Sequence, residues 1–312
     1  MHAITVDEYG AAATLTDVPD PRAGQGHVLI KIEAAGMNPM DRMIANGGWK
    51  ARMPATFPLI LGADLAGVVE AVGEDASKFS PGEEVFGQLL IAPLGSAGTY
   101  AERVAVPEDA TLARVPKGLD PVVAAALPTA GATALEIVES LEPLVGKIVL
   151  IVGAAGGVGS FATQLAANAG AHVIAVARID AADRMRAYGA AETVDRTAVS
   201  VPDAVRRTCP DGIDVLVDVA SDANGFSDLA SLVRPGGTAL TTRYVADTEA
   251  LASREVTGVN FLVSISSGVL GRLADTVVSG RIVVPPITHV RLDDVPALDG
   301  NAHADGKTVI TF

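Results

Sequence analysis

A glycine-rich segment near the middle of the chain has the spacing of a phosphate-binding loop. It runs Val149-Leu150-Ile151-Val152-Gly153-Ala154-Ala155-Gly156-Gly157-Val158-Gly159-Ser160. An apolar strand leads into small residues that open a helix, where bare backbone can approach a pyrophosphate and the helix N-terminus attracts its charge. In the G-x-G-x-x-G spacing, Ala154 replaces the first glycine, while Gly156 and Gly159 are in register. Gly159 is expected to allow close packing of the helix on the strand. We predict dinucleotide binding, rather than a tight turn without a ligand, with contacts from Ala154, Ala155, Gly156, Gly157 and Val158.

The residue after the next apolar run indicates which dinucleotide fits. His172 to Ala177 predicts a strand, and Arg178 follows it, where an NAD site usually carries Asp or Glu. A guanidinium can bind a 2′-phosphate through two hydrogen bonds, whereas an acid would repel it. We therefore predict NADPH as the cofactor, with Arg196 as a second candidate near the adenine. Two alternatives stay open: Arg178 on a solvent-facing loop, and use of NADH because of the nearby Asp180.

The elements that position these residues change in type near residue 120. Before it, short apolar runs separated by Gly and Pro predict a β-rich, barrel-like unit; examples are residues 28–32, 65–72 and 98–106. After it, apolar strands alternate with helical runs, the strands at 147–152, 171–177, 214–219 and 238–242 and the helices at 157–169 and 181–188. This alternation predicts a doubly wound parallel sheet. Ligands bind at the carboxyl ends of such strands, so the residues predicted to line a nicotinamide are Ala220, Ser221, Thr241 and Thr242.

Composition argues against several classes of function. The chain has 312 residues, 49% of them hydrophobic, a formal net charge of −14 and a pI of about 4.7. A protein this acidic repels nucleic acid backbones and anionic membranes, so neither is an expected partner. The one cysteine cannot form an internal disulfide, and the N-terminus lacks the pattern of a signal peptide. We expect a soluble, cytoplasmic protein of about two domains.

Several further motifs, together with the glycine loop and in the same order, resemble the zinc-independent quinone oxidoreductases of the medium-chain dehydrogenase/reductase superfamily. They are Gly36-Met37-Asn38-Pro39-Met40-Asp41, Leu61-Gly62-Ala63-Asp64-Leu65-Ala66-Gly67-Val68-Val69, Ala125-Ala126-Leu127-Pro128-Thr129-Ala130-Gly131-Ala132-Thr133-Ala134 and Leu232-Val233-Arg234-Pro235-Gly236-Gly237. The resemblance implies an α/β protein with a GroES-like β-barrel catalytic domain at residues 1–121 and 265–312. It also implies a Rossmann NADP-binding domain at residues 122–264, an active site in the cleft between the domains, and a homodimer.

The resemblance also implies roles for individual residues. Asn38 would lie at the active site and orient the nicotinamide or the acceptor oxygen, because an amide both donates and accepts hydrogen bonds. Asp41 would anchor a loop or helix rather than act as an acid. Thr129 matches the family position on the nicotinamide side of the cofactor. The run from Asn260 to Ser264 resembles the family's return loop, where Phe261 and Val263 would hold the carboxamide.

Zinc-dependent relatives carry metal ligands that this chain lacks. They carry Cys in place of Asn38 and a His-Glu pair in place of Ala63 and Asp64, and they have a cysteine-rich lobe for a structural zinc. This chain lacks these ligands, and its five histidines, His303 among them, are scattered. We therefore predict no metal site. Without a Lewis acid, hydride delivery to an already electrophilic acceptor is favoured over oxidation of a simple alcohol.

One departure from the family concerns the proton donor. Many quinone oxidoreductases have a tyrosine in an Asp-x-Tyr setting, whereas this chain has Asp41-Arg42-Met43. Met43 can pack against an acceptor but cannot donate a proton, and Trp49 is a candidate apolar wall of the substrate site. No catalytic acid is assigned. Because water can protonate the anion of a reduced quinone, quinones are favoured as acceptors.

Three hypotheses follow for the function. The first is an NADPH-dependent quinone reductase that transfers hydride without zinc. The second is an NADPH-dependent reductase of activated C=C bonds in enals or enones. The third belongs to another class, an NADPH-binding sensor or structural protein with little turnover. Consumption of NADPH with different acceptors distinguishes all three.

Overall fold

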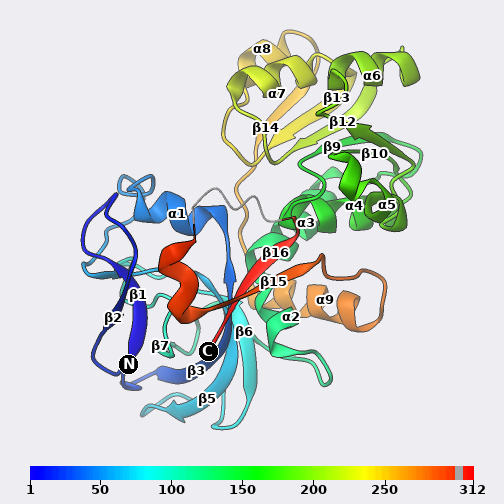
Figure 1. Cartoon of the computed structure of the whole chain (residues 1–312). Helices are drawn as coiled ribbons and strands as arrows, with labels where there is room; N and C mark the ends of the chain where they lie inside the picture. Colours follow the sequence, from blue (N-terminus) through cyan, green and yellow to red (C-terminus); the bar gives the residue numbers. More distant parts are fainter. Residues whose placement is uncertain (299–304) are drawn as a thin grey trace. The chain divides into compact units, whose positions relative to one another are not determined.

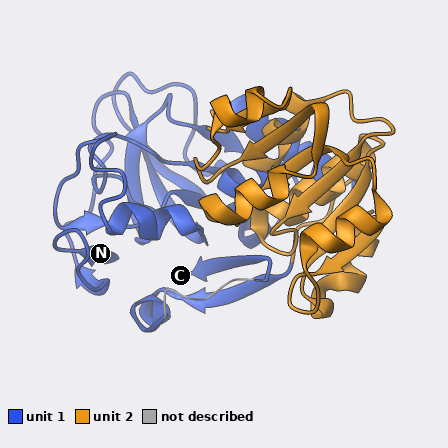
Figure 2. Ribbon diagram, turned by 90° about the horizontal axis from the view of Figure 1, so that it is seen from above, with its two compact units in different colours: residues 1–132, 265–280, 286–312 blue, residues 133–264, 281–285 orange. Residues whose placement is uncertain are grey.

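The computed structural model describes residues 1–298 and 305–312. They form two compact units (Figure 2). Unit 1 comprises Met1–Ala132, Ile265–Gly280 and Pro286–Phe312, and unit 2 comprises Thr133–Ser264 and Arg281–Pro285. The chain first passes from unit 1 to unit 2 within helix α3 (Pro128–Leu141). The sequence placed this division at residue 121, which is where helix α2 (Pro121–Ala125) begins; α2 contacts strands of unit 1.

Unit 1 is built mainly of antiparallel strands. Among the described residues, its larger sheet has the order β15-β16-β3-β5-β6-β8, with β7 also paired to β3. These strands are β3 (His27–Met37), β5 (Asp64–Val72), β6 (Glu84–Gln88), β7 (Arg103–Pro107), β8 (Leu112–Arg114), β15 (Ile287–Arg291) and β16 (Lys307–Thr311). A smaller sheet contains β1 (His2–Val6), β2 (Thr14–Asp17) and β4 (Leu59–Ile60). The helical segments of this unit include α1 (Pro39–Ala45), α9 (Ser267–Val278) and the short η2 (Leu292–Ala297).

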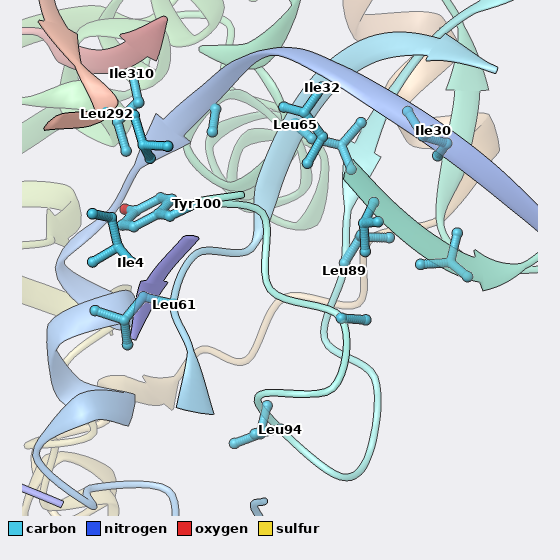
Figure 3. Close-up of a cluster of buried hydrophobic side chains, with 14 of the residues drawn as sticks. Ile4, Ile30, Ile32, Leu61, Leu65, Leu89, Leu94, Tyr100, Leu292 and Ile310 are labelled. Atoms are coloured by element: carbon cyan, nitrogen blue, oxygen red, sulfur yellow. The ribbon is translucent and has the colours of Figure 1, made fainter. Parts of the chain in front are cut away.

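The core of unit 1 follows from alternation along the strands. In β3, Val28, Ile30 and Ile32 are buried, while Lys31 and Glu33 are exposed, as the two-residue period of a strand requires. The buried side chains from several strands form one apolar cluster. Figure 3 shows Tyr100 within it, with its ring among aliphatic side chains. A phenol in such surroundings needs a hydrogen-bond partner of its own.

Unit 2 is a parallel sheet flanked by helices (Figure 1). The order of its six described strands is β11-β10-β9-β12-β13-β14. They are β9 (Ile148–Val152), β10 (His172–Ala177), β11 (Glu192–Asp195), β12 (Ile213–Asp218), β13 (Val233–Thr241) and β14 (Thr257–Asn260). The flanking helices are α4 (Gly157–Asn168), η1 (Ile179–Ala181), α5 (Ala182–Ala187), α6 (Val201–Thr208), α7 (Ala223–Ala230) and α8 (Thr248–Ala252). Counted along the chain this is the order 3-2-1-4-5-6 of a Rossmann sheet, so the predicted fold class is confirmed.

One predicted strand was too long. The run at residues 98–106 is a strand only from Arg103 onwards. The residues before it bond to a neighbouring loop instead: Tyr100 N–H donates to Leu61 O at 2.9 Å. Gly98 lies so close to the end of β4 that a Cβ would be 2.2 Å from Ile60 O. Within the described residues, the helices are all too short or too polar to cross a membrane.

Candidate active site

The glycine loop of unit 2 joins β9 to α4 through a tight turn. Gly153 follows the last residue of β9 and has a φ of +81°, a conformation that suits glycine. Helix α4 then packs directly on the loop, since a Cβ at Gly159 would be 2.2 Å from Gly153 O. The predicted close packing at Gly159 is confirmed by this distance. A side chain at either position would displace the helix from the strand.

Gly156 differs from these two glycines because the protein does not need it for packing. A Cβ there would meet only Gly153 O, at 3.4 Å. Gly156 is also the N-cap of α4, and no side chain caps this helix end. The first-turn N–H groups, at Gly157 and Val158, therefore border a space that a side chain would fill. Such a cradle at a helix N-terminus fits a phosphate.

The next strand on the other side of β9 ends beside this loop. β9 lies between β10 and β12, where the strand order reverses and where such sheets bind ligands. Ala220, which follows β12, lies against the loop: a Cβ at Gly153 would be 3.0 Å from the Ala220 Cβ. Asp218 fixes this segment, since its Oδ1 accepts hydrogen bonds from the N–H groups of Ala220 and Ser221, both at 2.9 Å. The structure thus brings Ala220 and Ser221 to the glycine loop.

Strands β13 and β14 pair in parallel, so their carboxyl ends lie side by side. The Thr241 side chain is fully buried, and its Oγ1 accepts a hydrogen bond from Arg243 N–H at 3.0 Å. The predicted contact of Thr241 with the nicotinamide stays a prediction. Phe261 N–H donates to Thr241 O at 2.8 Å, which fixes the start of the segment after β14. Phe261 and Val263 are half-buried, and Leu262 between them is 63% exposed.

Arg178 is an exposed residue that is already paired. It follows β10 directly, and its guanidinium donates to both carboxylate oxygens of Asp180. The ion pair holds the pKa of Asp180 below its usual range, mainly through the hydrogen bond from Arg178. Arg196 follows β11 and is exposed; because Ala177 pairs with Asp195, both arginines lie at the same edge of the sheet. A phosphate at this edge would compete with Asp180 for Arg178.

In unit 1, Asn38 is the hub of a buried polar network. It lies between β3 and α1, and it is 9% exposed. Its Nδ2 donates to Asp64 Oδ2 at 2.8 Å, and its Oδ1 accepts from Lys307 Nζ at 2.7 Å. Both ends of the amide are therefore bonded within the protein. The predicted contact of Asn38 with cofactor or acceptor stays a prediction.

Asp64 connects Asn38 to Thr129, the other predicted contact residue of unit 1. Asp64 is fully buried at the start of β5. Its Oδ1 accepts from Thr129 Oγ1 at 2.6 Å and its Oδ2 from Thr129 N–H at 3.0 Å. Gln88, at the end of β6, donates to Thr129 Oγ1 at 2.7 Å. Thr129 is half-buried, so the network reaches the protein surface there.

Asp41 anchors helix α1, as predicted. Its Oδ2 accepts hydrogen bonds from Asn38 N–H at 2.7 Å and from the Tyr100 hydroxyl at 2.6 Å. Its Oδ1 has no hydrogen-bond partner in the described part of the chain. Asp41 is also one of the residues that line a cavity of about 20 Å³, room for roughly one water molecule. Burial raises the pKa of Asp41 to about 7, although the bond from Tyr100 opposes the rise. Burial and the nearby Asp41 raise the pKa of Tyr100 well above its usual range.

The two predicted substrate contacts lie in and after α1. Met43 is 43% exposed, and its side chain covers Gly48, where a Cβ would be 2.7 Å from the Met43 Cγ. Trp49 is half-buried and packs against the apolar core of unit 1. The Arg52 guanidinium lies 5.8 Å from the centre of the Trp49 ring. Trp49 thus has a packing role, and its predicted contact with an acceptor is untested.

Comparison with known proteins places these features in a family. Residues 24–117 match the family model "Alcohol dehydrogenase GroES-like domain", and residues 157–267 match "Zinc-binding dehydrogenase". The chloroplastic NADPH-dependent alkenal/one oxidoreductase of Arabidopsis thaliana is 32% identical, over 99% of this chain and 79% of its own. The quinone oxidoreductase of Homo sapiens is 33% identical, over 76% of this chain and 71% of its own. The solved quinone oxidoreductase from Coxiella burnetii is 26% identical, with a TM-score of 0.85 over 100% of this chain and 99% of its own.

The chain belongs to the quinone oxidoreductase-like family of the medium-chain dehydrogenase/reductase superfamily. It is accordingly an NAD(P)H-dependent oxidoreductase of this family. Within residues 1–298 and 305–312, no three His, Cys, Asp or Glu residues cluster in a way that could hold a metal ion. His303 lies outside the described residues. That the enzyme works without zinc stays a prediction.

Sequence reasoning missed four residues of the polar network in this oxidoreductase. The predicted contact residues or Asp41 are bonded to Asp64, Gln88, Tyr100 and Lys307. One signal could have identified Lys307: it stands in register with Val309, on the buried face of a short apolar strand. A charged residue on such a face needs a partner. Gln88 and Tyr100 carry no comparable signal in the sequence.

Proposed function

We propose that this chain is an NADPH-dependent reductase of quinones that delivers hydride without zinc. One observation supports the proposal most: the uncapped N-terminus of α4 at Gly156 lies at the reversal point of the sheet, with Arg178 at the end of the neighbouring strand. A helix N-terminus attracts a pyrophosphate, and a guanidinium suits a 2′-phosphate. The substrate would then be a small electron-poor molecule.

Different residues of unit 2 would bind different parts of the cofactor. The backbone of Gly156, Gly157 and Val158 would hold the pyrophosphate, and Arg178 would bind the 2′-phosphate in place of Asp180. Ala220 and Ser221, fixed by Asp218, would border the nicotinamide. The bound cofactor supplies a hydride. The protein supplies orientation, which contributes much of the acceleration in such reactions.

Proton supply favours a quinone over an alkene. The phenol of Tyr100 is 2% exposed and donates its hydrogen to Asp41. It is therefore held away from any acceptor at the surface of unit 1. The exposed Met43 carries no proton to give. The oxygens of a reduced quinone take protons rapidly from water, whereas the carbon of the enolate formed from an enal or enone is protonated more slowly and gains more from a positioned acid.

Reduction of activated C=C bonds is the second candidate. The relative named as an NADPH-dependent alkenal/one oxidoreductase matches nearly the whole chain, whereas the human quinone oxidoreductase matches about three quarters of it. A homodimer, which the family resemblance implies, is also part of the proposal.

The proposal is tested by following NADPH absorbance with purified protein and three acceptors in parallel. These are 1,4-benzoquinone, 9,10-phenanthrenequinone and a 2-alkenal, each repeated with NADH and with protein-free blanks. We expect turnover with the quinones and a preference for NADPH. Turnover with the alkenal alone would move the function to double-bond reduction. NADPH binding without turnover on any acceptor would favour a sensor or structural protein.

A further inference from the structure

Lys307 is a buried cation to which the sequence assigned no role. It begins β16, is 3% exposed, and lies among residues that other segments bring to it. Its Nζ donates to Met37 O at 2.9 Å and to Asn38 Oδ1 at 2.7 Å. A lysine is seldom buried unless it is paired. The two bonds supply Lys307 with partners inside the protein, and they have two consequences for the residues around it.

The first consequence is a fixed orientation of the Asn38 amide. A lysine only donates hydrogen bonds, and a carboxylate only accepts them. Lys307 therefore requires the amide oxygen, and Asp64 requires the amide nitrogen. With both neighbours present, a flipped Asn38 would place two donors together and two acceptors together. Neither neighbour alone would impose this order so strictly.

The second consequence is charge balance around Asp64. Burial raises the pKa of Asp64 and lowers the pKa of Lys307, and each group opposes the shift of the other. Asp64 accepts hydrogen bonds from Asn38 Nδ2 and from both donors of Thr129, an arrangement suited to a carboxylate. The ammonium of Lys307 thus helps Asp64 to hold the Thr129 hydroxyl.

We propose that Lys307 is a positioning residue, which orders the Asn38 amide and, through Asp64, the Thr129 hydroxyl. Asn38 and Thr129 are the two residues of unit 1 predicted to contact the cofactor, so the proposal rests on the proposed function for its effect on turnover. Its structural content, one amide orientation that Lys307 imposes together with Asp64, holds in the protein without cofactor.

The central test is the double variant Lys307→Met, Asp64→Asn, which removes both buried charges together. Lys307→Met alone leaves Asp64 without its cation and is expected to lower the melting temperature. The double variant avoids that unpaired charge, so its melting temperature should return to within about 3 °C of the wild type. Lys117→Met, at an exposed lysine of unit 1, is the matched control.

The first readout needs no cofactor. In amide NMR spectra, with the Asn38 side-chain signals assigned through Asn38→Ser, the wild type should show a slowly exchanging pair of Nδ2 hydrogens. In Lys307→Met, which leaves Asp64 to accept from Nδ2, their exchange should speed up by about tenfold or more, because the amide oxygen is no longer held. Unchanged exchange of the Asn38 Nδ2 hydrogens in folded Lys307→Met would overturn the proposal.

The second readout separates positioning from simple stability. We expect the double variant to bind NADPH within about threefold of the wild type, because unit 2 supplies the phosphate contacts, while single-turnover reduction of 1,4-benzoquinone slows by about tenfold or more. A folded double variant that keeps the wild-type rate would show that Lys307 has only a structural role.

A third measurement uses the wild type alone. The Lys307 ammonium hydrogens, buried and bonded, should give a resolved 15N-correlated signal, and loss of that signal to solvent exchange would contradict the placement. This measurement tests the buried, bonded placement of Lys307 even if the double variant does not fold. If the wild type reduces no acceptor, the proposed function fails, yet the NMR measurements still decide the role of Lys307.

Discussion

Each unit holds an aspartate and a basic residue, in opposite surroundings. In unit 1 the two are joined through Asn38, whereas in unit 2 they bond directly. In unit 1, Asp64 is fully buried and Lys307 is 3% exposed, and both are bonded on several sides. In unit 2, the side chains of Arg178 and Asp180 are 59% and 56% exposed and bond to one another. In unit 1, removing either charge should destabilise the fold, because the other charge would remain buried without compensation. Water screens the second pair, so a ligand can replace one partner.

The contrast suggests how one chain combines rigidity with exchangeable binding. The buried pair orders neighbouring amide and hydroxyl groups, and no ligand can displace it without exposing a charge. In the exposed pair, a phosphate could replace Asp180 as the partner of Arg178, because a phosphate carries more negative charge than a carboxylate. Substitutions in the two units should therefore differ in kind: those in unit 1 should change stability and rate, and those in unit 2 should change how tightly a cofactor binds or which cofactor is preferred.

The largest effect is expected from a side chain at Gly156, which would fill the space at the N-terminus of α4. Gly156→Val adds a side chain where the protein itself leaves room, since even a Cβ meets only Gly153 O at 3.4 Å. The fold should tolerate it, while binding of both NADPH and NADH should weaken by about a hundredfold or more, close to 2.7 kcal/mol. Fluorescence titration measures this. Gly271→Val, at an uncrowded glycine in α9, is the control, and unchanged affinity in Gly156→Val would remove the loop from the site.

Asp41 tests the buried side of the comparison through pH. Its pKa is about 7 in the folded protein and 3.8 for a free side chain, so folding takes up a proton between these values. The contribution of this group is therefore present at low pH and is lost as pH rises through about 7. The amide introduced by Asp41→Asn does not titrate. From pH 5 to pH 8 the wild type should lose about 2.5 kcal/mol of unfolding free energy relative to that variant.

Denaturant unfolding at the two pH values measures the difference between wild type and variant. Asp228→Asn, at an exposed carboxyl in α7, controls for the general effect of removing a charge. Equal pH dependence in wild type and Asp41→Asn would mean that Asp41 is ionised throughout this range. The variant should fit, because an amide is nearly the same size as a carboxyl group and Asp41 borders a cavity.

Arg178→Ala tests the exposed pair directly. If the guanidinium binds the 2′-phosphate, NADPH affinity should fall by about ten- to a hundredfold, while NADH affinity barely changes. Arg207→Ala, at an exposed arginine of α6, makes the same change in net charge and is the control. Small and equal losses for both cofactors would rule out Arg178 as the phosphate ligand.

The sequence predicted the features that depend on local pattern. Glycine spacing predicted the loop at residues 153–159, and strand–helix alternation predicted the parallel sheet of unit 2, because both follow from short-range sterics and periodicity. The strand predicted at residues 98–106 was too long because its first residues bond to a loop that is distant in sequence. Periodicity carries no information about that bond.

The polar network could be predicted only in part, for the same reason. Asn38 and Thr129 lie in recognisable motifs, but Lys307 reaches Asn38 across 269 positions of sequence. The pairing of Arg178 with Asp180 spans two positions and was visible as proximity, though not as a bond with both carboxylate oxygens. Long-range polar contacts thus account for most of what the sequence did not reveal.

Asp180→Asn should have the smallest effect and the most informative sign. The carboxylate holds Arg178 and adds a negative charge where a 2′-phosphate would bind. Removing that charge should tighten NADPH binding by roughly three- to tenfold, and the gain should shrink at high salt because the site is exposed. NADH should bind somewhat more weakly, since a carboxylate accepts a ribose hydroxyl better than an amide does.

Asp211→Asn, at an exposed turn of unit 2, is the control for Asp180→Asn because it makes the same charge change elsewhere. If Asp180→Asn leaves the ratio of NADPH to NADH affinity unchanged, then the pair does not set cofactor choice. If NADPH instead binds more weakly, Asp180 holds Arg178 in its binding position, and the exposed pair acts as the buried one does.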